Sequence, residues 1–163
     1  MVFVDGTNLF NRLIRDKVRI TKLFPILELA ANRRQLVRAA IYTTEEKFIA
    51  AQEIHGSDFA DGVRLVYGDS VDTENGQVRE KGVDALLVAD LVYHAAQKNC
   101  NYVSLVSADS DFRFALNRVG DFGCRVGLMA ICNPAPPRLK NEADDYWFLN
   151  KKWLIDNKYA SAT

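Results

Sequence analysis

The sequence has few of the residues that build disulfide frameworks and transition-metal sites. It contains three cysteines, none of them in a CxxC pair: Cys100, Cys124 and Cys132. An odd number without close pairs argues against a disulfide framework and against a zinc site with cysteine ligands. Only two histidines are present, His55 and His94, which argues against a histidine-rich metal site. His94 lies one helical turn beyond Asp90, and we interpret that pair as structural.

Long apolar runs and nucleotide-binding motifs are also missing. No run approaches the roughly 20 apolar residues of a membrane helix, and the first residues lack the charged and apolar regions of a signal peptide. Neither GxGxxG nor GxxxxGK[ST] occurs, which disfavours a nucleotide-binding protein of the Rossmann or P-loop type. We expect a cytoplasmic chain with reduced cysteines.

An excess of one charge is absent as well. The chain has 21 basic and 21 acidic residues, which argues against coating of long nucleic acid through bulk electrostatics. The charges are unevenly distributed, since residues 1–40 hold eight Lys and Arg against three acids, and residues 45–90 hold eleven acids against four basic residues. This polarisation suits an acidic pocket beside a phosphate-binding rim, but solvated faces produce the same distribution.

The length and the order of apolar segments predict one α/β domain over residues 1–163. A chain of 163 residues can bury one core and is too short for two ordinary domains. The expected strands cover residues 2–4, 36–43, 63–67, 103–106, 124–129 and 146–149. The expected helices cover residues 9–14, 27–31, 45–55, 83–96, 112–119, 139–143 and 151–159. This alternation predicts a three-layer domain with a central, mostly parallel twisted sheet and helices on both faces.

Three connections have their own signals. The basic passage 15–22 is expected to be irregular, and Pro25 is expected to break the following helix near its start. Residues 68–82 are polar and carry Asn75-Gly76, which predicts an exposed β-excursion with a hairpin turn. Thr7 or Asn8 is expected to cap the first helix.

Two carboxylates follow the apolar strand 103–106. Asp109 and Asp111 stand where this strand reaches its carboxyl end, which is the edge of an open α/β sheet at which ligands bind. One of them can instead cap the helix that begins near Phe112. A cap with a solvated neighbour therefore explains the pair as well as a ligand site does.

Two further acids are expected at the same edge. Asp5 follows the first strand, and Asp84 lies at the head of the helix 83–96. Converging carboxylates repel one another, so three or four together are tolerated chiefly when a divalent cation neutralises them. Oxygen ligands select Mg²⁺ or Mn²⁺. Such a site activates water and stabilises an in-line displacement at phosphorus.

Three motifs in order carry a resemblance that covers nearly the whole chain: Val4-Asp5-Gly6-Thr7-Asn8-Leu9, Lys81-Gly82-Val83-Asp84 with Asp90, and Ser107-Ala108-Asp109-Ser110-Asp111-Phe112. They resemble the NYN domain, in its LabA-like (DUF88) branch, within the PIN-like nuclease superfamily. Leu139, Ala143-Asp144 and Tyr146 are similar to the closing motif of that family. A departure is Ala108, where relatives more often have a glycine, and its methyl group could narrow the approach of the backbone to a substrate.

The resemblance implies a PIN-like sheet and a metal-dependent ribonuclease. It assigns the Mg²⁺ or Mn²⁺ site to Asp5, Asp84, Asp109 and Asp111. It implies that Asn8 orients a water, ligand or backbone near the metal, and that Ser107 supports the loop or contacts a phosphate. Lys81 could neutralise a phosphate oxygen, or could be a solvated loop cation. Asp90 lies about 240° around the helix from Asp84 and is given a supporting role, and Asp144 is interpreted as scaffold.

The expected partner is RNA, single-stranded or structured, and no membrane. The basic set Arg12, Arg15, Lys17, Arg19 and Lys22 is our candidate phosphate rim. Phe10 and Phe112 could stack bases but also suit helix cores. A homodimer is left open.

Two other functions compete with the ribonuclease. A catalytically weak or inactive RNA-binding or interaction module can keep the same fold. A haloacid-dehalogenase-type phosphatase is suggested by Asp109-Ser110-Asp111, but Arg113 stands where that family has Thr or Val.

Overall fold

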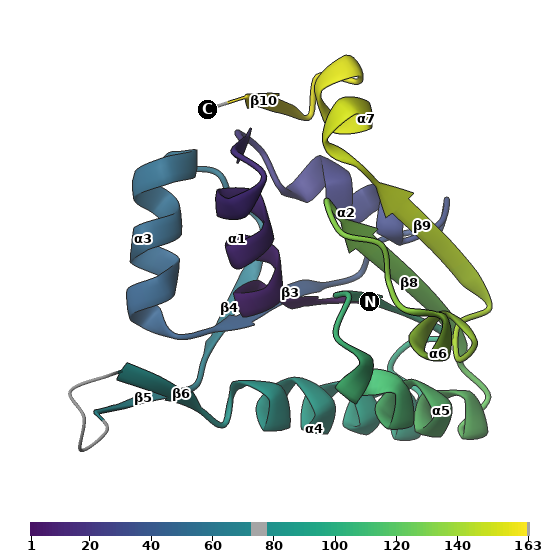
Figure 1. The fold of residues 1–163 in the computed structure, drawn as a ribbon. Coiled ribbons are helices and arrows are strands. Elements are labelled where there is room, and N and C mark those ends of the chain that lie inside the picture. Colours follow the sequence, from purple (N-terminus) through teal and green to yellow (C-terminus); the bar gives the residue numbers. More distant parts are fainter. Residues whose placement is uncertain (73–77, 163) are drawn as a thin grey trace.

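Six parallel strands form the sheet at the centre of the molecule, in the order β4-β3-β1-β7-β8-β9 (Figure 1). The computed structural model describes residues 1–72 and 78–162. The strands of the sheet are β1 (Val2–Asp5), β3 (Ala39–Thr43), β4 (Arg64–Tyr67), β7 (Tyr102–Val106), β8 (Arg125–Ile131) and β9 (Asp145–Leu149). Every residue of β1 and β7 is buried, as central parallel strands require. The two lie side by side, with Val4 opposite Val106.

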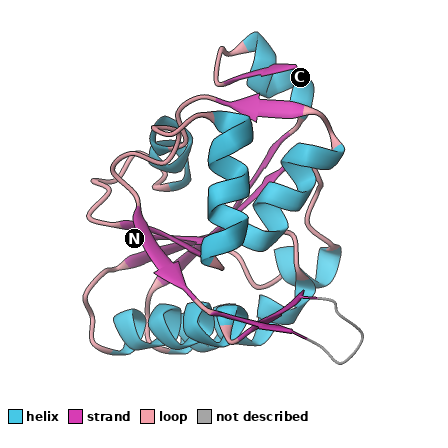
Figure 2. Ribbon diagram, turned by 90° about the vertical axis from the view of Figure 1, so that its left-hand side faces the viewer, coloured by secondary structure: helices cyan, strands magenta, loops and turns pink. Residues whose placement is uncertain are grey.

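Helices cover both faces of the sheet and give the three layers that we predicted (Figure 2). One face packs against α1 (Gly6–Arg15), α2 (Phe24–Ala30), α3 (Glu45–His55) and α7 (Lys151–Asp156). The other face packs against α4 (Val83–Ala96), α5 (Arg113–Asp121), the short α6 (Pro137–Lys140) and the 3-10 turn η1 (Ser110–Phe112). The two hydrophobic cores therefore lie on opposite sides of one sheet.

Several boundaries differ from the sequence prediction. The passage 15–22 is not irregular, because it contains β2 (Val18–Ile20), which pairs antiparallel with β10 (Ala160–Ala162). Three residues are too few to show a strand period. The last helix ends at Asp156 rather than at Tyr159, since the chain must extend to reach β2. Pro25 does not break a helix, because it stands in the first turn of α2, where a missing N–H costs nothing.

The predicted β-excursion is a two-stranded hairpin beside the sheet. Its strands are β5 (Asp69–Asp72) and β6 (Val78–Lys81), which pair antiparallel. The predicted turn at Asn75-Gly76 lies outside the described residues. The hairpin leads directly into α4, so it sets where that helix begins.

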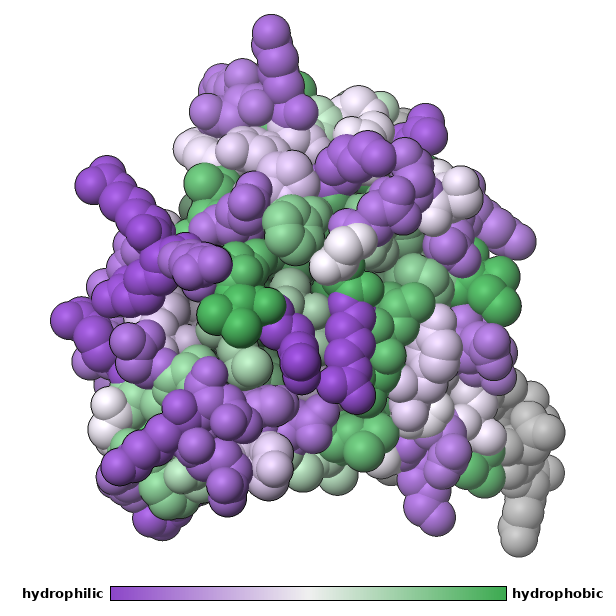
Figure 3. Space-filling model, turned by 180° about the vertical axis from the view of Figure 1, so that it is seen from behind, coloured by the Kyte–Doolittle hydropathy of each residue, from purple (hydrophilic) through white to green (hydrophobic). Residues whose placement is uncertain are grey.

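The surface is hydrophilic over much of the rear face, with hydrophobic side chains gathered near its middle (Figure 3). Across residues 1–72 and 78–162, no helix has the length and apolarity needed to cross a bilayer.

The start of α1 lies very close to β3 because residue 6 has no side chain. A Cβ on Gly6 would stand 2.8 Å from the Tyr42 carbonyl oxygen, 2.8 Å from Ile41 Cγ2 and 2.9 Å from Thr43 Cβ. Side-chain carbon atoms do not approach backbone oxygen this closely, so the glycine allows Asp5 to be followed at once by a helix.

We predict that Gly6→Ala lowers the free energy of unfolding by about 1 to 3 kcal/mol, because the strand must move to admit the methyl group. The matched control is Gly120→Ala in α5, where a Cβ would meet nothing within 4 Å. That change should be neutral or stabilising by up to about 1 kcal/mol. Urea unfolding measures both, and equal effects of the two substitutions would contradict the close approach.

Candidate active site

The carboxyl ends of β1 and β7 bring Asp5 to the loop that carries Asp109 and Asp111. Asp5 is the last residue of β1, and Ser107 directly follows β7. Both side chains are buried, Asp5 at 4% exposed and Ser107 at 3%. The Ser107 hydroxyl donates to Asp5 Oδ2 at 2.8 Å. The two central strands are thus joined by a polar bond at the predicted ligand edge.

Asp5 also caps the first helix. Its Oδ1 accepts the backbone N–H of Asn8 at 3.0 Å, in the N-cap position of α1. The prediction that Thr7 or Asn8 is the cap is therefore wrong. The helix begins one residue after the strand ends, so the cap is the strand's last residue.

Asn8 and Ser107 hold the loop after β7 against α1. Asn8 Oδ1 accepts the N–H of Ala108 at 3.3 Å, and Ser107 Oγ accepts the N–H of Asp109 at 3.0 Å. Asn8 thus contacts backbone, which is one of the roles that the resemblance implied. These bonds fix the position of Asp109 relative to Asp5.

The sequence left open whether Asp109 and Asp111 cap a helix or form a ligand site, and the two residues differ in this respect. Asp109 Oδ1 accepts the N–H of Asp111 at 2.9 Å and caps η1. Asp111 is exposed. Capping therefore accounts for one side-chain oxygen of Asp109. It involves only the backbone N–H of Asp111, not its side chain.

Asp84 reaches the same edge from the other side of the sheet. It lies in the first turn of α4, which starts after Gly82 at a left-handed φ of 82°. A glycine adopts this φ without strain. A helix N-terminus favours a negative side chain, so α4 presents Asp84 in a position that tolerates its charge.

The acids act on one another electrostatically. Burial raises the pKa of Asp5 from 3.8 to about 6, and the charges of Asp84 and Asp109 add to this, while the bonds from Asn8 and Ser107 oppose it. Burial also raises the pKa of Asp84, with further contributions from Asp109, Glu80 and Asp111. These charge effects link Asp5 with Asp84 and Asp109, and Asp84 with Asp109 and Asp111.

This group suits a divalent cation in its chemistry and charge. Its donors are carboxylate oxygens, and no ion pair reaches any of the four aspartates within residues 1–72 and 78–162. The same described residues contain no three Asp, Glu, His or Cys side chains placed closely enough to hold one ion directly. Mg²⁺ commonly keeps several waters and binds only one or two carboxylates. The acids could thus hold an ion through a mixture of direct and water-mediated contacts.

The sequence reasoning missed a polar network beside this group. Glu80, in β6, accepts the Thr7 hydroxyl at 2.8 and 3.0 Å and pairs with Lys47 of α3 at 3.0 Å. These contacts tie the hairpin to α1 and α3. Thr7 and Glu80 stand next to selected motif residues, but their pairing across 73 positions has no local signal.

The structure does not bring the whole predicted basic rim to the acids. Lys81 is exposed at the end of β6, three residues before Asp84. Arg15 ends α1, whose ten residues span about 15 Å from the acid edge. Arg19 lies near Gly56, past the far end of α3. A phosphate held by Arg15 or Arg19 would therefore be several nucleotides from one held at the acids.

The supporting residues lie elsewhere. Asp90 accepts the Tyr42 hydroxyl at 2.8 Å, and Asp144 Oδ2 accepts the N–H of Val126 at 2.7 Å, as scaffold residues do. Phe10 and Phe112 are buried in the two cores, so base stacking by either is wrong for this structure.

Most of the chain matches a known protein family. The model of the NYN domain family matches residues 1–150. This chain belongs to the NYN domain family. The family lies within the PIN-like nuclease superfamily, whose NYN members generally use divalent metal ions.

Two similar proteins carry no assigned activity. The uncharacterized protein y4oD of Sinorhizobium fredii (strain NBRC 101917 / NGR234) is 42% identical over 74 residues, which cover 43% of this chain and 34% of that protein. This NYN chain thus matches about a third of that relative's length. The crystal structure of VPA0982, a protein of unknown function from Vibrio parahaemolyticus RIMD 2210633, superposes with a TM-score of 0.69 at 16% identity, covering 92% of this chain and 91% of that one. At this identity the likeness shows the fold alone.

The raised pKa of Asp5 makes stability depend on pH. A carboxyl whose pKa is higher in the folded state stabilises the fold below its unfolded pKa of 3.8 and loses that contribution as the pH rises through about 6. Asp5→Asn keeps the cap but does not titrate. The difference in the free energy of unfolding, wild type minus variant, should fall by about 2 to 3 kcal/mol between about pH 4 and pH 7. Urea unfolding in EDTA measures it, and a pH-independent difference would show that Asp5 titrates normally.

Proposed function

We propose that this NYN domain is an Mg²⁺- or Mn²⁺-dependent endoribonuclease that hydrolyses RNA phosphodiester bonds at the carboxyl edge of β1 and β7. One observation carries the proposal. Burial raises the pKa values of Asp5 and Asp84, and neighbouring carboxylates add to this, with Asp84 and Asp109 acting on Asp5 and Asp109, Glu80 and Asp111 acting on Asp84. No cation of the described residues pairs with any of the four aspartates. Groups with perturbed pKa values that no ion pair explains are typical of functional sites.

Each acid has a distinct position for this chemistry. Asp5 is the fixed point, because both of its oxygens are hydrogen-bonded in the interior. Asp109 is held by its backbone, and its capping bond uses Oδ1. Asp84 enters from α4. A divalent ion bound among them would supply charge neutralisation for the reacting phosphate and a more acidic water.

Further residues would serve the substrate rather than the ion. Asn8 and Ser107 keep the loop of Asp109 in place, so they would act by positioning. Lys81 is exposed near Asp84 and is our candidate for a phosphate oxygen. Arg15 and Arg19 would contact phosphates several nucleotides away, along single-stranded or structured RNA. A cytoplasmic location, membership of the LabA-like (DUF88) branch and a homodimer belong to the same proposal.

A second function is supported by a specific observation. No three acidic, His or Cys side chains in the described part of the chain are close enough to hold one ion directly. A catalytically weak or inactive RNA-binding module would need no such arrangement. Cleavage and binding therefore have to be measured separately.

Asp109→Asn should lower cleavage of single-stranded RNA by at least about 100-fold in the presence of Mg²⁺ or Mn²⁺. The asparagine oxygen can still accept the N–H of Asp111, and one negative charge leaves the group. The fold should be as stable as that of the wild type or more so. Cleavage of labelled RNA with and without EDTA, together with thermal unfolding, measures both effects.

The control is Asp61→Asn, an exposed aspartate outside the group, which should leave cleavage unchanged. Wild-type turnover by Asp109→Asn at saturating metal would rule out the hydrolytic role. Tight RNA binding without cleavage by the wild type would favour the binding module.

A further inference from the structure

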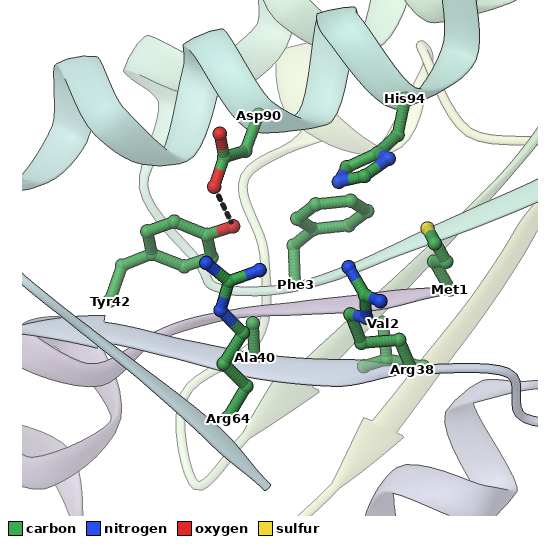
Figure 4. A pocket seen from close by; sticks show the side chains of 9 residues that line it. All are labelled: Met1, Val2, Phe3, Arg38, Ala40, Tyr42, Arg64, Asp90 and His94. Atoms are coloured by element: carbon green, nitrogen blue, oxygen red, sulfur yellow. Dashed lines mark hydrogen bonds between the residues drawn. The ribbon is translucent and has the colours of Figure 1, made fainter. Parts of the chain in front are cut away.

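A small pocket lined by charged and apolar side chains lies at the opposite edge of the same sheet. It opens between the starts of β3 and β4 on one side and the middle and end of α4 on the other (Figure 4). The enclosed space is only about 10 Å³, room for about one water molecule, so a larger group would bind at the mouth of the pocket. Val2 and Phe3 begin β1 at its base, whereas Asp5 ends that strand at the acid edge. The pocket is therefore separate from the acidic group.

Two arginines from neighbouring strands line this pocket. Arg38 directly precedes β3, and Arg64 begins β4 opposite Ala40. Figure 4 shows both guanidinium groups turned toward the same opening. Both residues are exposed, and neither forms an ion pair with any residue in 1–72 or 78–162. Two unpaired like charges on one pocket favour an anion between them, and the planar guanidinium groups match phosphate oxygens.

The α4 side of the pocket has one fixed acid. Tyr42 donates its hydroxyl to Asp90 Oδ2 at 2.8 Å. Burial, together with this bond, raises the pKa of the Tyr42 hydroxyl, so the proton stays on the tyrosine. One carboxylate facing two guanidinium groups leaves the side chains of the pocket with one net positive charge.

His94 completes the wall as a neutral donor. Its ring lies over Phe3, with centroids 6.1 Å apart, and burial lowers the pKa of the ring. The Asn99 amide group is 2.9 Å from Nδ1. When the amide nitrogen donates to Nδ1, the neutral ring carries its proton on Nε2 and can donate a hydrogen bond there.

We propose that Arg38 and Arg64 bind a phosphate group of the RNA strand whose reacting phosphate lies at the acidic group. The inference rests on RNA being the substrate, as proposed above. Helix α4 sets the separation, since Asp84 lies in its first turn and His94 in its last. Ten residues of helix span about 15 Å. Successive phosphates of a stacked strand are about 3.4 Å apart along the axis, so the bound phosphate lies several nucleotides from the reacting one.

The test measures the affinity for RNA in the presence of EDTA, because the proposed cleavage requires a divalent ion and would otherwise degrade the probe. The probe is a fluorescent single-stranded RNA of about ten nucleotides, a length within the range of ordinary single-strand sites, followed by anisotropy at several salt concentrations. Arg38→Gln with Arg64→Gln should raise Kd about tenfold or more, since charged hydrogen bonds to phosphate are lost. The slope of log K against log salt should shrink by about one unit.

The control removes the same charge elsewhere. Arg33→Gln with Lys152→Gln changes two exposed cations, Arg33 three residues after α2 and Lys152 in α7, where it pairs with Asp156. This control should change Kd by less than about threefold. A third variant tests whether RNA affinity rises when the pocket becomes more positive. Asp90→Asn removes the one negative charge of the pocket but keeps an acceptor for Tyr42. It should therefore lower Kd for RNA, and it should not raise Kd at any salt concentration.

Competition with inorganic phosphate distinguishes a site for a phosphate group of RNA from a site for free phosphate. Inorganic phosphate should compete with RNA on the wild-type protein and lose its effect on the double arginine variant. One contrary result is a double arginine variant that loses phosphate binding, seen as loss of ³¹P line broadening, and still binds RNA as tightly as the control does. That result would overturn the proposal that the two arginines bind a phosphate of the RNA strand. An equal Kd for the arginine variant and the control, with no phosphate effect, would overturn the pocket itself. Reduced RNA affinity in a protein that never cleaves RNA would support the pocket and contradict the ribonuclease.

Discussion

The hydrogen bond from Ser107 to Asp5 is the contact on which the site depends. It joins the ends of the two central strands in the interior, 2.8 Å from hydroxyl to carboxylate and 102 residues apart in sequence. The same hydroxyl receives the N–H of Asp109, so one serine fixes one acid directly and the next through its backbone. A buried carboxylate is costly unless it is hydrogen-bonded, and these bonds hold Asp5 near other negative charges.

Much of this arrangement follows from parallel-sheet geometry. Because parallel strands end at one edge, the acids after 2–4 and 103–106 could be predicted to meet, and the buried strands β1 and β7 are adjacent. The long helices α3 and α4 were also predicted with the bounds that they have, 45–55 and 83–96. For these strands and helices, the local sequence pattern and the tertiary structure agree.

Other features depend on contacts that leave no local mark. The β2–β10 ribbon has three residues on each side, too few for a period, and it forms because the chain end returns to residues 18–20. Asp5 rather than Asn8 caps α1 because Gly6 lets the helix start against β3. Glu80 meets Thr7 only through the placement of the hairpin. The separation of Arg15 and Arg19 from the acids likewise depends on helix direction, which sequence proximity to Asp5 does not reveal.

The two edges of the sheet carry opposite charge. Acids gather where the strands end, and Arg38 and Arg64 stand where β3 and β4 begin. A polyanion that lay along α4 would meet cations at one end and would need a bound cation at the other. Parallel topology, rather than a basic surface, would then orient a strand on a chain with no net charge.

The most direct test of this account is the anomalous difference density of crystals soaked in excess Mn²⁺. We expect a peak at the carboxyl edge of β1 and β7, beside Asp5, Asp84 and Asp109, with waters completing the coordination at about 2.1 to 2.2 Å. No peak at that edge, in crystals where Mn²⁺ binds elsewhere, would contradict the central claim.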